Sequence, residues 1–196
     1  SSKKQDVIPG NDPKSSSSKT EVKQSGNEGI VTAEDNTMSS VGGVVAVASN
    51  SAVLSQVYNS GAINAGSAIG VGGIAGKFIT KAAMTNAFNQ GQITAGTASV
   101  GGIIGKAEDC SITGAYNAGV VPKTDRSASI AGEKLSSSVM TGVFYDVTLQ
   151  VSVTEDGTAV ENMKSPDFLA QLNAVENVWT IVSDKYAGFP IFTWMN

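Results

Sequence analysis

The stretch VGGIAG at Val71–Gly76 decides the fold, because the chain repeats it at regular intervals. A near copy, VGGIIG, begins at Val100, and a looser copy, VGGVVA, begins at Val41. A degraded fourth copy, SASIAG, begins at Ser127. Repetition of one phrase about every thirty residues is the signature of an architecture built from stacked, similar units.

A second set of repeats is aligned on aromatic residues and gives the period of the unit. Its four rows read LSQVYNSG from Leu54, MTNAFNQG from Met84, ITGAYNAG from Ile112 and MTGVFYDV from Met140. The rows begin 30, 28 and 28 residues apart. They define an aromatic column and an asparagine column, which consist of Tyr58, Phe88, Tyr116 and Phe144, and of Asn59, Asn89 and Asn117.

Each unit holds three short apolar segments separated by small polar turns. The segments are four to six residues long and rich in isoleucine, valine, threonine and aromatics, which favours strands over helices. Three short strands in each repeat predict one coil of a parallel β-helix, and parallel crossovers are overwhelmingly right-handed. We therefore expect an all-β fold: a short right-handed parallel β-helix of about four coils, with a small C-terminal α+β cap and a flexible N-terminal tail.

The two columns have clear roles in such a coil. Like residues of successive coils lie about 4.8 Å apart, so asparagine amides can bond to one another and aromatic rings can stack. The aromatic residues share strand parity with Leu54, Met84, Ile112 and Met140, which predicts that they point into the coil. An aromatic column that faced outward would instead be a platform for stacking sugars.

Three regions follow from composition. Residues 1–27 are rich in serine and lysine with little to bury, which predicts a flexible tether. Residues 28–146 carry the repeats, and residues 147–196 read as a cap. In the cap, Ser165 and Pro166 are typical of a helix start, and Trp179–Val182 and Ile191–Trp194 are expected to be strands. We expect the cap to cover an open end of the solenoid.

Composition also removes several classes of function. The 196 residues carry a net charge of −4, which leaves no basic field for nucleic acid. The chain has no histidine, so it lacks the commonest general base and metal ligand. Its single cysteine, Cys110, excludes an intrachain disulfide, and no apolar run approaches the roughly 20 residues that span a bilayer. We predict no cofactor and no metal.

The glycine phrases GGIAG (Gly72–Gly76) and GGIIG (Gly101–Gly105), with AFNQGQI and AYNAGVV, resemble the GLUG-motif repeat. The C-terminal pattern is similar too, through Met163, Phe168, Leu172, Asn173, Trp179, Gly188–Ile191 and Trp194. The resemblance spans roughly residues 29–196. It implies β-helical scaffolding in secreted and surface proteins of bacteria, often of gut Bacteroides type, where such repeats accompany immunoglobulin A peptidases and haemagglutinin-like proteins. Without histidine the zinc motif H-E-x-x-H cannot exist, so the peptidase association does not carry over.

The candidate ligand face is a small set of charged residues: Lys77, Lys81, Lys106, Glu108 and Asp109. The three lysines could form a basic patch, or they could protect strand edges. The adjacent carboxylates would point to opposite faces of a strand, so they predict a solvated turn and no catalytic pair. No catalytic or cofactor-binding residue is predicted, and Cys110 is expected to be a small buried residue.

Three functions are consistent with these features. The first is a non-enzymatic cell-surface binding or adhesion module, whose partner is an extracellular glycan or a host or bacterial surface protein. The alternatives are a polysaccharide-cleaving β-helix enzyme and a structural spacer or assembly subunit. The start SSKKQD resembles a lipoprotein just after its lipid-bearing cysteine, which predicts a lipid anchor upstream of Ser1 and a place on the bacterial outer-membrane surface. The sequence leaves the oligomeric state open.

Overall fold

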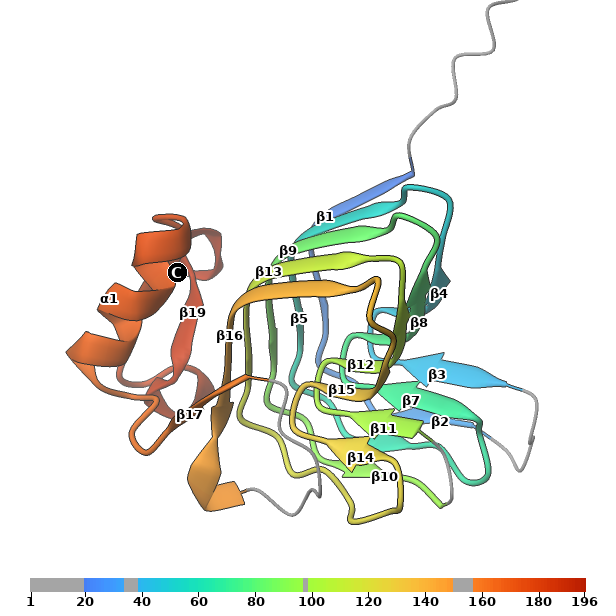
Figure 1. The fold of residues 1–196 in the computed structure, drawn as a ribbon. Helices are drawn as coiled ribbons and strands as arrows, with labels where there is room; N and C mark the ends of the chain where they lie inside the picture. Colours follow the sequence, from blue (N-terminus) through green and yellow to red (C-terminus); the bar gives the residue numbers. More distant parts are fainter. Residues whose placement is uncertain (1–19, 34–38, 97–98, 150–156) are drawn as a thin grey trace, which may run out of the picture.

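The computed structural model describes residues 20–33, 39–96, 99–149 and 157–196, which form a β-solenoid with a C-terminal flank (Figure 1). The first coil contains β1 (Glu21–Asn27), β2 (Val31–Thr32), β3 (Ser40–Gly42) and β4 (Val45–Ala48). The second contains β5 (Val53–Asn59), β6 (Ile63–Asn64), β7 (Gly70–Gly72) and β8 (Ala75–Ile79). The third contains β9 (Ala83–Asn89), β10 (Ile93–Thr94), β11 (Ser99–Gly101) and β12 (Ile104–Glu108). The fourth contains β13 (Ser111–Asn117), β14 (Ser127–Ala128) and β15 (Ala131–Lys134), and β16 (Val139–Asp146) and β17 (Thr158–Val160) follow it.

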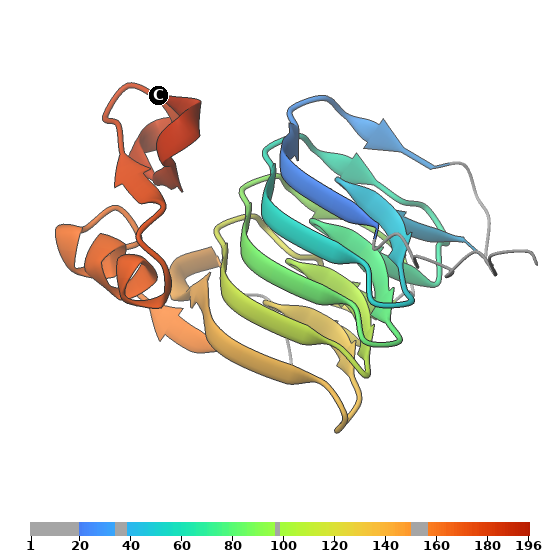
Figure 2. The same ribbon diagram turned by 90° about the horizontal axis from the view of Figure 1, so that it is seen from above.

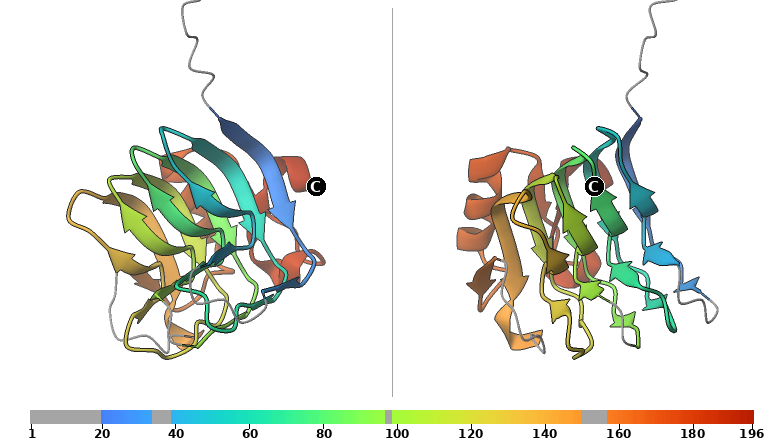
Figure 3. Two further views of the ribbon diagram at one scale, coloured as in Figure 1. Left: turned by 90° about the vertical axis from the view of Figure 1, so that its right-hand side faces the viewer. Right: turned by 45° about the vertical axis from the view of Figure 1, so that its right-hand side comes forward.

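Strands at equivalent places in successive coils pair in parallel, which confirms the predicted fold class. The longest sheet has the order β1-β5-β9-β13-β16-β17, and the other sides of the solenoid are β10-β6-β2, β14-β11-β7-β3 and β15-β12-β8-β4. The register follows the predicted rows, because Phe88 is paired with both Tyr58 and Tyr116. Figure 2 shows the coils stacked from β1 at one end to β16 at the other, and Figure 3 shows the same stack from its side.

The glycine phrase forms two strands, where the sequence predicted one. In the second coil β7 ends at Gly72 and β8 begins at Ala75, so the chain turns a corner at Gly73. A Cβ atom added to Gly73 would lie 2.1 Å from the carbonyl oxygen of Gly102 and 2.4 Å from Cγ of Asn89. The corner is therefore too crowded for any side chain, and the first three coils each have four strands.

A left-handed residue in the middle of each long strand reverses the predicted direction of the aromatic column. Gln56 has φ +53°, and the equivalent Asn86, Gly114 and Gly142 also have positive φ. Such a residue bends the strand and shifts its alternation by one. Leu54 and Val57 consequently share the solenoid interior, while Tyr58 packs outside it against the C-terminal segment. The inward placement predicted from parity is wrong, because parity was counted across this bend.

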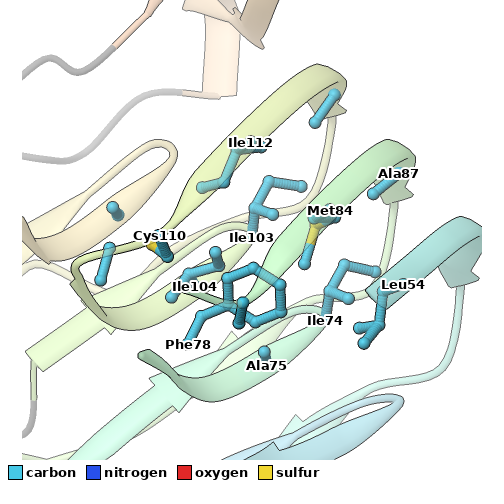
Figure 4. Packing of buried hydrophobic residues seen from close by; sticks show 14 of the residues in the cluster. Leu54, Ile74, Ala75, Phe78, Met84, Ala87, Ile103, Ile104, Cys110 and Ile112 are labelled. Carbon is cyan, nitrogen blue, oxygen red and sulfur yellow. The ribbon is translucent and has the colours of Figure 1, made fainter. Parts of the chain in front are cut away.

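Aliphatic residues fill the interior of the solenoid (Figure 4). Columns of similar side chains run along its axis, so Leu54, Met84 and Ile112 lie in neighbouring coils around Phe78. The thiol of Cys110 is buried in this cluster, as expected of a small core residue. Burial of such side chains is the main stabilising contribution to each coil.

The asparagine column is a continuous hydrogen-bonded ladder. Nδ2 of Asn59 donates to Oδ1 of Asn89 at 2.8 Å, and Nδ2 of Asn89 donates to Oδ1 of Asn117 at 2.9 Å. Each amide also donates to the carbonyl oxygen of the glycine two residues later. The ladder begins one coil earlier than predicted, because Nδ2 of Asn27 donates to Oδ1 of Asn59 at 2.8 Å.

The first coil corrects the predicted boundary of the tether at residue 27. Residues 1–19 lie outside the described part of the chain, but Glu21–Asn27 is β1 and pairs with β5 along its length. Gly26 occupies the aromatic column there, and a Cβ atom added to it would lie 2.1 Å from the ring of Tyr58. Glycine therefore allows the ring of Tyr58 to lie over the first coil.

The C-terminal segment packs along the flank of the solenoid and not over its end as predicted (Figures 1 and 2). It contains α1 (Pro166–Val175), β18 (Trp179–Ile181) and β19 (Pro190–Phe192), with short 3-10 turns at Val147–Leu149, Tyr186–Gly188 and Thr193–Met195. Ser165 caps α1 as predicted, since its hydroxyl accepts from the Phe168 amide at 3.1 Å. None of the helices in the described ranges is long and apolar enough to cross a membrane.

Candidate functional site

The outer surface of the sheet β15-β12-β8-β4 carries the best candidate for a ligand-binding face. Lys77 on β8 is paired with Lys106 on β12, which in turn is paired with Glu133 on β15. Strand pairing places these side chains in a row at the spacing of neighbouring strands, about 4.8 Å. We call Lys77, Lys106 and Glu133, with the adjacent Arg126 and Ser99, the charged face.

Glu133 is the centre of the charged face. Its carboxylate lies 3.2 Å from Nζ of Lys106 and 3.8 Å from the Arg126 guanidinium, and it accepts from the Ser99 hydroxyl at 3.2 Å. Partial burial raises the pKa of Glu133, but Lys106, Ser99 and Arg126 outweigh it and lower the pKa overall. Glu133 is therefore ionised at neutral pH, and no ion pair to Lys77 is found among the described residues. The charged face thus holds one carboxylate, Glu133, beside two lysines, Lys77 and Lys106.

The structure separates the remaining predicted residues from this row. Lys81 lies in the left-handed turn between β8 and β9, where it lines a hollow of about 210 Å³ with Asp109 and Cys110. Glu108 ends β12 on the outer surface opposite Ile79, whereas Asp109 occupies the next turn with φ +49°. Both residues are exposed, but only Asp109 lies in a turn, because Glu108 is still part of the strand.

The hollow beside Lys81 holds no activated thiol. Cys110 is 5% exposed, and its Sγ atom lies 3.5 Å from the Ser138 hydroxyl. Burial is the main cause that raises the pKa of Cys110, so the neutral thiol predominates near neutral pH. Within the described ranges, no three potential histidine, cysteine or carboxylate ligands are grouped to hold a metal ion.

The aromatic column is outward but is not open to a ligand. Phe88 stacks between Tyr58 and Tyr116, with ring centroids 5.1 and 5.3 Å apart. All three rings are buried, because Phe168, Trp179 and Phe192 of the C-terminal segment pack against the column. The platform that sugars could have used is therefore occupied by the protein's own chain.

Polar contacts fix the C-terminal segment to three coils. The hydroxyls of Tyr58 and Tyr186 both donate to Glu28, the Asn86 amide donates to Glu176, and the Tyr116 hydroxyl donates to the Pro190 carbonyl. The hydrogen bond from Tyr186, followed by that from Tyr58, lowers the pKa of Glu28. Burial is the largest cause that raises the pKa of Tyr58.

Sequence reasoning missed three members of the charged face. Glu133 could have been found, because alignment of SASIAGEK with VGGIIGKA puts it in the column of Lys106. Arg126 and Ser99 gave no such signal, since one lies in a loop and the other in a different sheet. Their place beside Glu133 depends on how the coil closes.

Comparison with known proteins supports the fold and leaves the family open. No protein-family model and no curated protein matches the chain, so the GLUG resemblance stays a prediction. A solved structure, described as a "putative immunoglobulin A1 protease" from Bacteroides ovatus, superposes with a TM-score of 0.66 at 19% sequence identity. The match covers 89% of this chain and 57% of that protein. The two chains therefore share a fold, and this chain spans little more than half of its neighbour's length.

Proposed function

We propose that this protein is a non-enzymatic binding module that presents the charged face of its solenoid to an extended glycan or to a surface protein. The observation that carries the proposal is the row formed by Lys77, Lys106 and Glu133 on the outer surface of a regular sheet, where all three residues are partly exposed. Repeat proteins commonly bind extended partners along such faces. A row of side chains at a fixed spacing suits a partner with its own regular spacing.

The repeated residues support a scaffold role. The asparagine ladder holds the corners, the aromatic column binds the C-terminal segment, and the aliphatic columns fill the interior. These columns leave variation to the outer faces and turns, as in other scaffolds that carry function on exposed positions.

We further propose an extracytoplasmic location, on the outer-membrane surface of a bacterium and with a lipid anchor upstream of Ser1. Two features support this proposal: the tail composition of residues 1–19 and the fold shared with a Bacteroides protein. The name of that neighbour also raises a peptidase as an alternative, but a mechanism that needs histidine is excluded by the composition of this chain.

The proposal is tested with glycan arrays and with binding to bacterial and epithelial surfaces, using the full chain in its wild-type form and as K77E/K106E. Loss of binding in the double variant, with retention in the charge-matched pair K81E/K123E, is the expected result. Equal loss in both pairs would refute the charged face, and no binding by the wild-type chain would favour a spacer. Polysaccharide turnover abolished by E108Q or D109N would instead establish the enzymatic alternative.

A further inference from the structure

Both ends of the solenoid leave strand edges unpaired within the described residues. At the C-terminal end β17 adds a short strand to β16, and β14 and β15 are the last described members of their sheets. At the other end each first-coil strand is the last member of its sheet, which leaves one side of β1 unpaired within the described residues. Figure 2 shows β1 and β16 at these opposite ends.

The N-terminal end also exposes apolar surface. A hollow of about 440 Å³ opens there, and its apolar lining includes Val22, Val45, Val47 and Leu54. Val47 is 50% exposed. An unpaired strand edge beside an apolar hollow is a typical site for pairing with another chain.

The edge of β1 is self-complementary in charge. Glu21 and Lys23 are exposed and flank the partly buried Val22, and neither has an ion-pair partner among the described residues. If two β1 strands pair antiparallel about a twofold axis through Val22, Glu21 of each chain faces Lys23 of the other. Opposite charges directly across a strand pair are stabilising.

The backbone N–H and C=O groups of Glu21 and Lys23 point in the direction that this pairing requires. The Thr20 carbonyl accepts from the Val53 amide, so Thr20 and Val22 direct their peptide groups toward β5. Strand peptide groups alternate sides, so those of Glu21 and Lys23 point to the free edge. They are therefore placed to exchange hydrogen bonds with Lys23 and Glu21 of a second chain.

We propose that two copies of this protein associate through their N-terminal ends, by antiparallel pairing of β1 around Val22. Pairing about a twofold axis uses the same edge of both copies, so the assembly is a closed dimer and not a filament. Such a dimer buries Val22 and Val47 of both copies and points the two solenoids away from each other. The inference is independent of the ligand that the charged face binds.

The test is the mass of the full chain between about 1 and 100 µM, measured by light scattering after gel filtration and by sedimentation velocity. Wild type is expected to reach the dimer mass with rising concentration. E21K and K23E should each weaken the dimer at least tenfold, since each places like charges opposite one another, and E21K/K23E should restore it. K81E, a charge change remote from the edge, should leave the dimer constant unchanged.

Two results would overturn the proposal. One is a monomer at every concentration, which would mean that no second copy covers the hollow; either residues 1–19 cover it or it stays open. The other is a dimer that the single and double swaps weaken alike. Amide hydrogen exchange gives a second readout, because Glu21 and Lys23 should gain protection with concentration while β16 does not.

Discussion

Replacement of Asn89 by alanine tests how much the asparagine ladder contributes to the fold. The Asn89 side chain is fully buried and takes part in four hydrogen bonds, with Asn59, Asn117 and both backbone groups of Gly91. A buried hydrogen bond contributes about 0.5–1.5 kcal/mol net, and an orphaned buried partner costs more. We expect N89A to lower the free energy of unfolding by about 3–5 kcal/mol.

Position along the ladder provides the control. Asn27 lies at the partly exposed start and donates to Asn59 and to the Gly29 carbonyl, so N27A should cost about 1 kcal/mol. Asn64 is exposed on β6, and N64A should change stability by less than about 0.5 kcal/mol. Urea unfolding followed by circular dichroism measures all three. The reasoning fails if N89A and N27A cost the same, because the ladder would then not act through burial.

Three further predictions concern other contacts. F168A should lower the free energy of unfolding in urea by about 3–5 kcal/mol, because the ring is 1% exposed and packs edge-on against Tyr116 and Phe144. A loss below about 1 kcal/mol would mean that the C-terminal segment is only loosely attached. The pKa of Glu28 is lowered in the folded protein, so the stability that the Glu28 carboxylate contributes is present above its ordinary pKa of 4.5 and is lost as pH falls through the folded pKa. The difference in melting temperature between wild type and E28Q should therefore shrink at acid pH. A difference that stays constant with pH would contradict this assignment. G102A should abolish folding or lower the melting temperature strongly, since its Cβ would lie 2.2 Å from Asn117, whereas G29A, with 3.7 Å to its nearest neighbour, should be tolerated.

The sequence predicted the solenoid because similar residues recur in it at regular intervals. Residues that occupy the same environment in each coil are similar, so the spacing of the rows became the register of the strands. The first coil was missed for the same reason. Its row, VKQSGNEG, keeps the glutamine, asparagine and last glycine of LSQVYNSG, but Gly26 stands in the place of the aromatic residue on which the rows were aligned.

The direction of the aromatic column could not be obtained from alternation alone. The left-handed residue is Gln56 in one coil and Asn86 in the next, and neither type requires that conformation. Glycine at positions 114 and 142 of the same column was the available signal, because glycine adopts it without strain. The flanking position of the C-terminal segment had no local signal, since it depends on which apolar surface remains uncovered after the coils have stacked.

Attachment of one segment to four coils gives the protein a fixed length. Many solenoids gain or lose units easily, because each repeat contacts only its neighbours. Here Tyr58, at one end of the aromatic column, meets Tyr186 and Trp194, while Phe144, at the other end, meets Phe168. The length of the C-terminal segment therefore fixes the number of coils. Duplication or deletion of a coil would leave part of this segment without a ring to pack on, so the number of coils can change only if the segment changes with it.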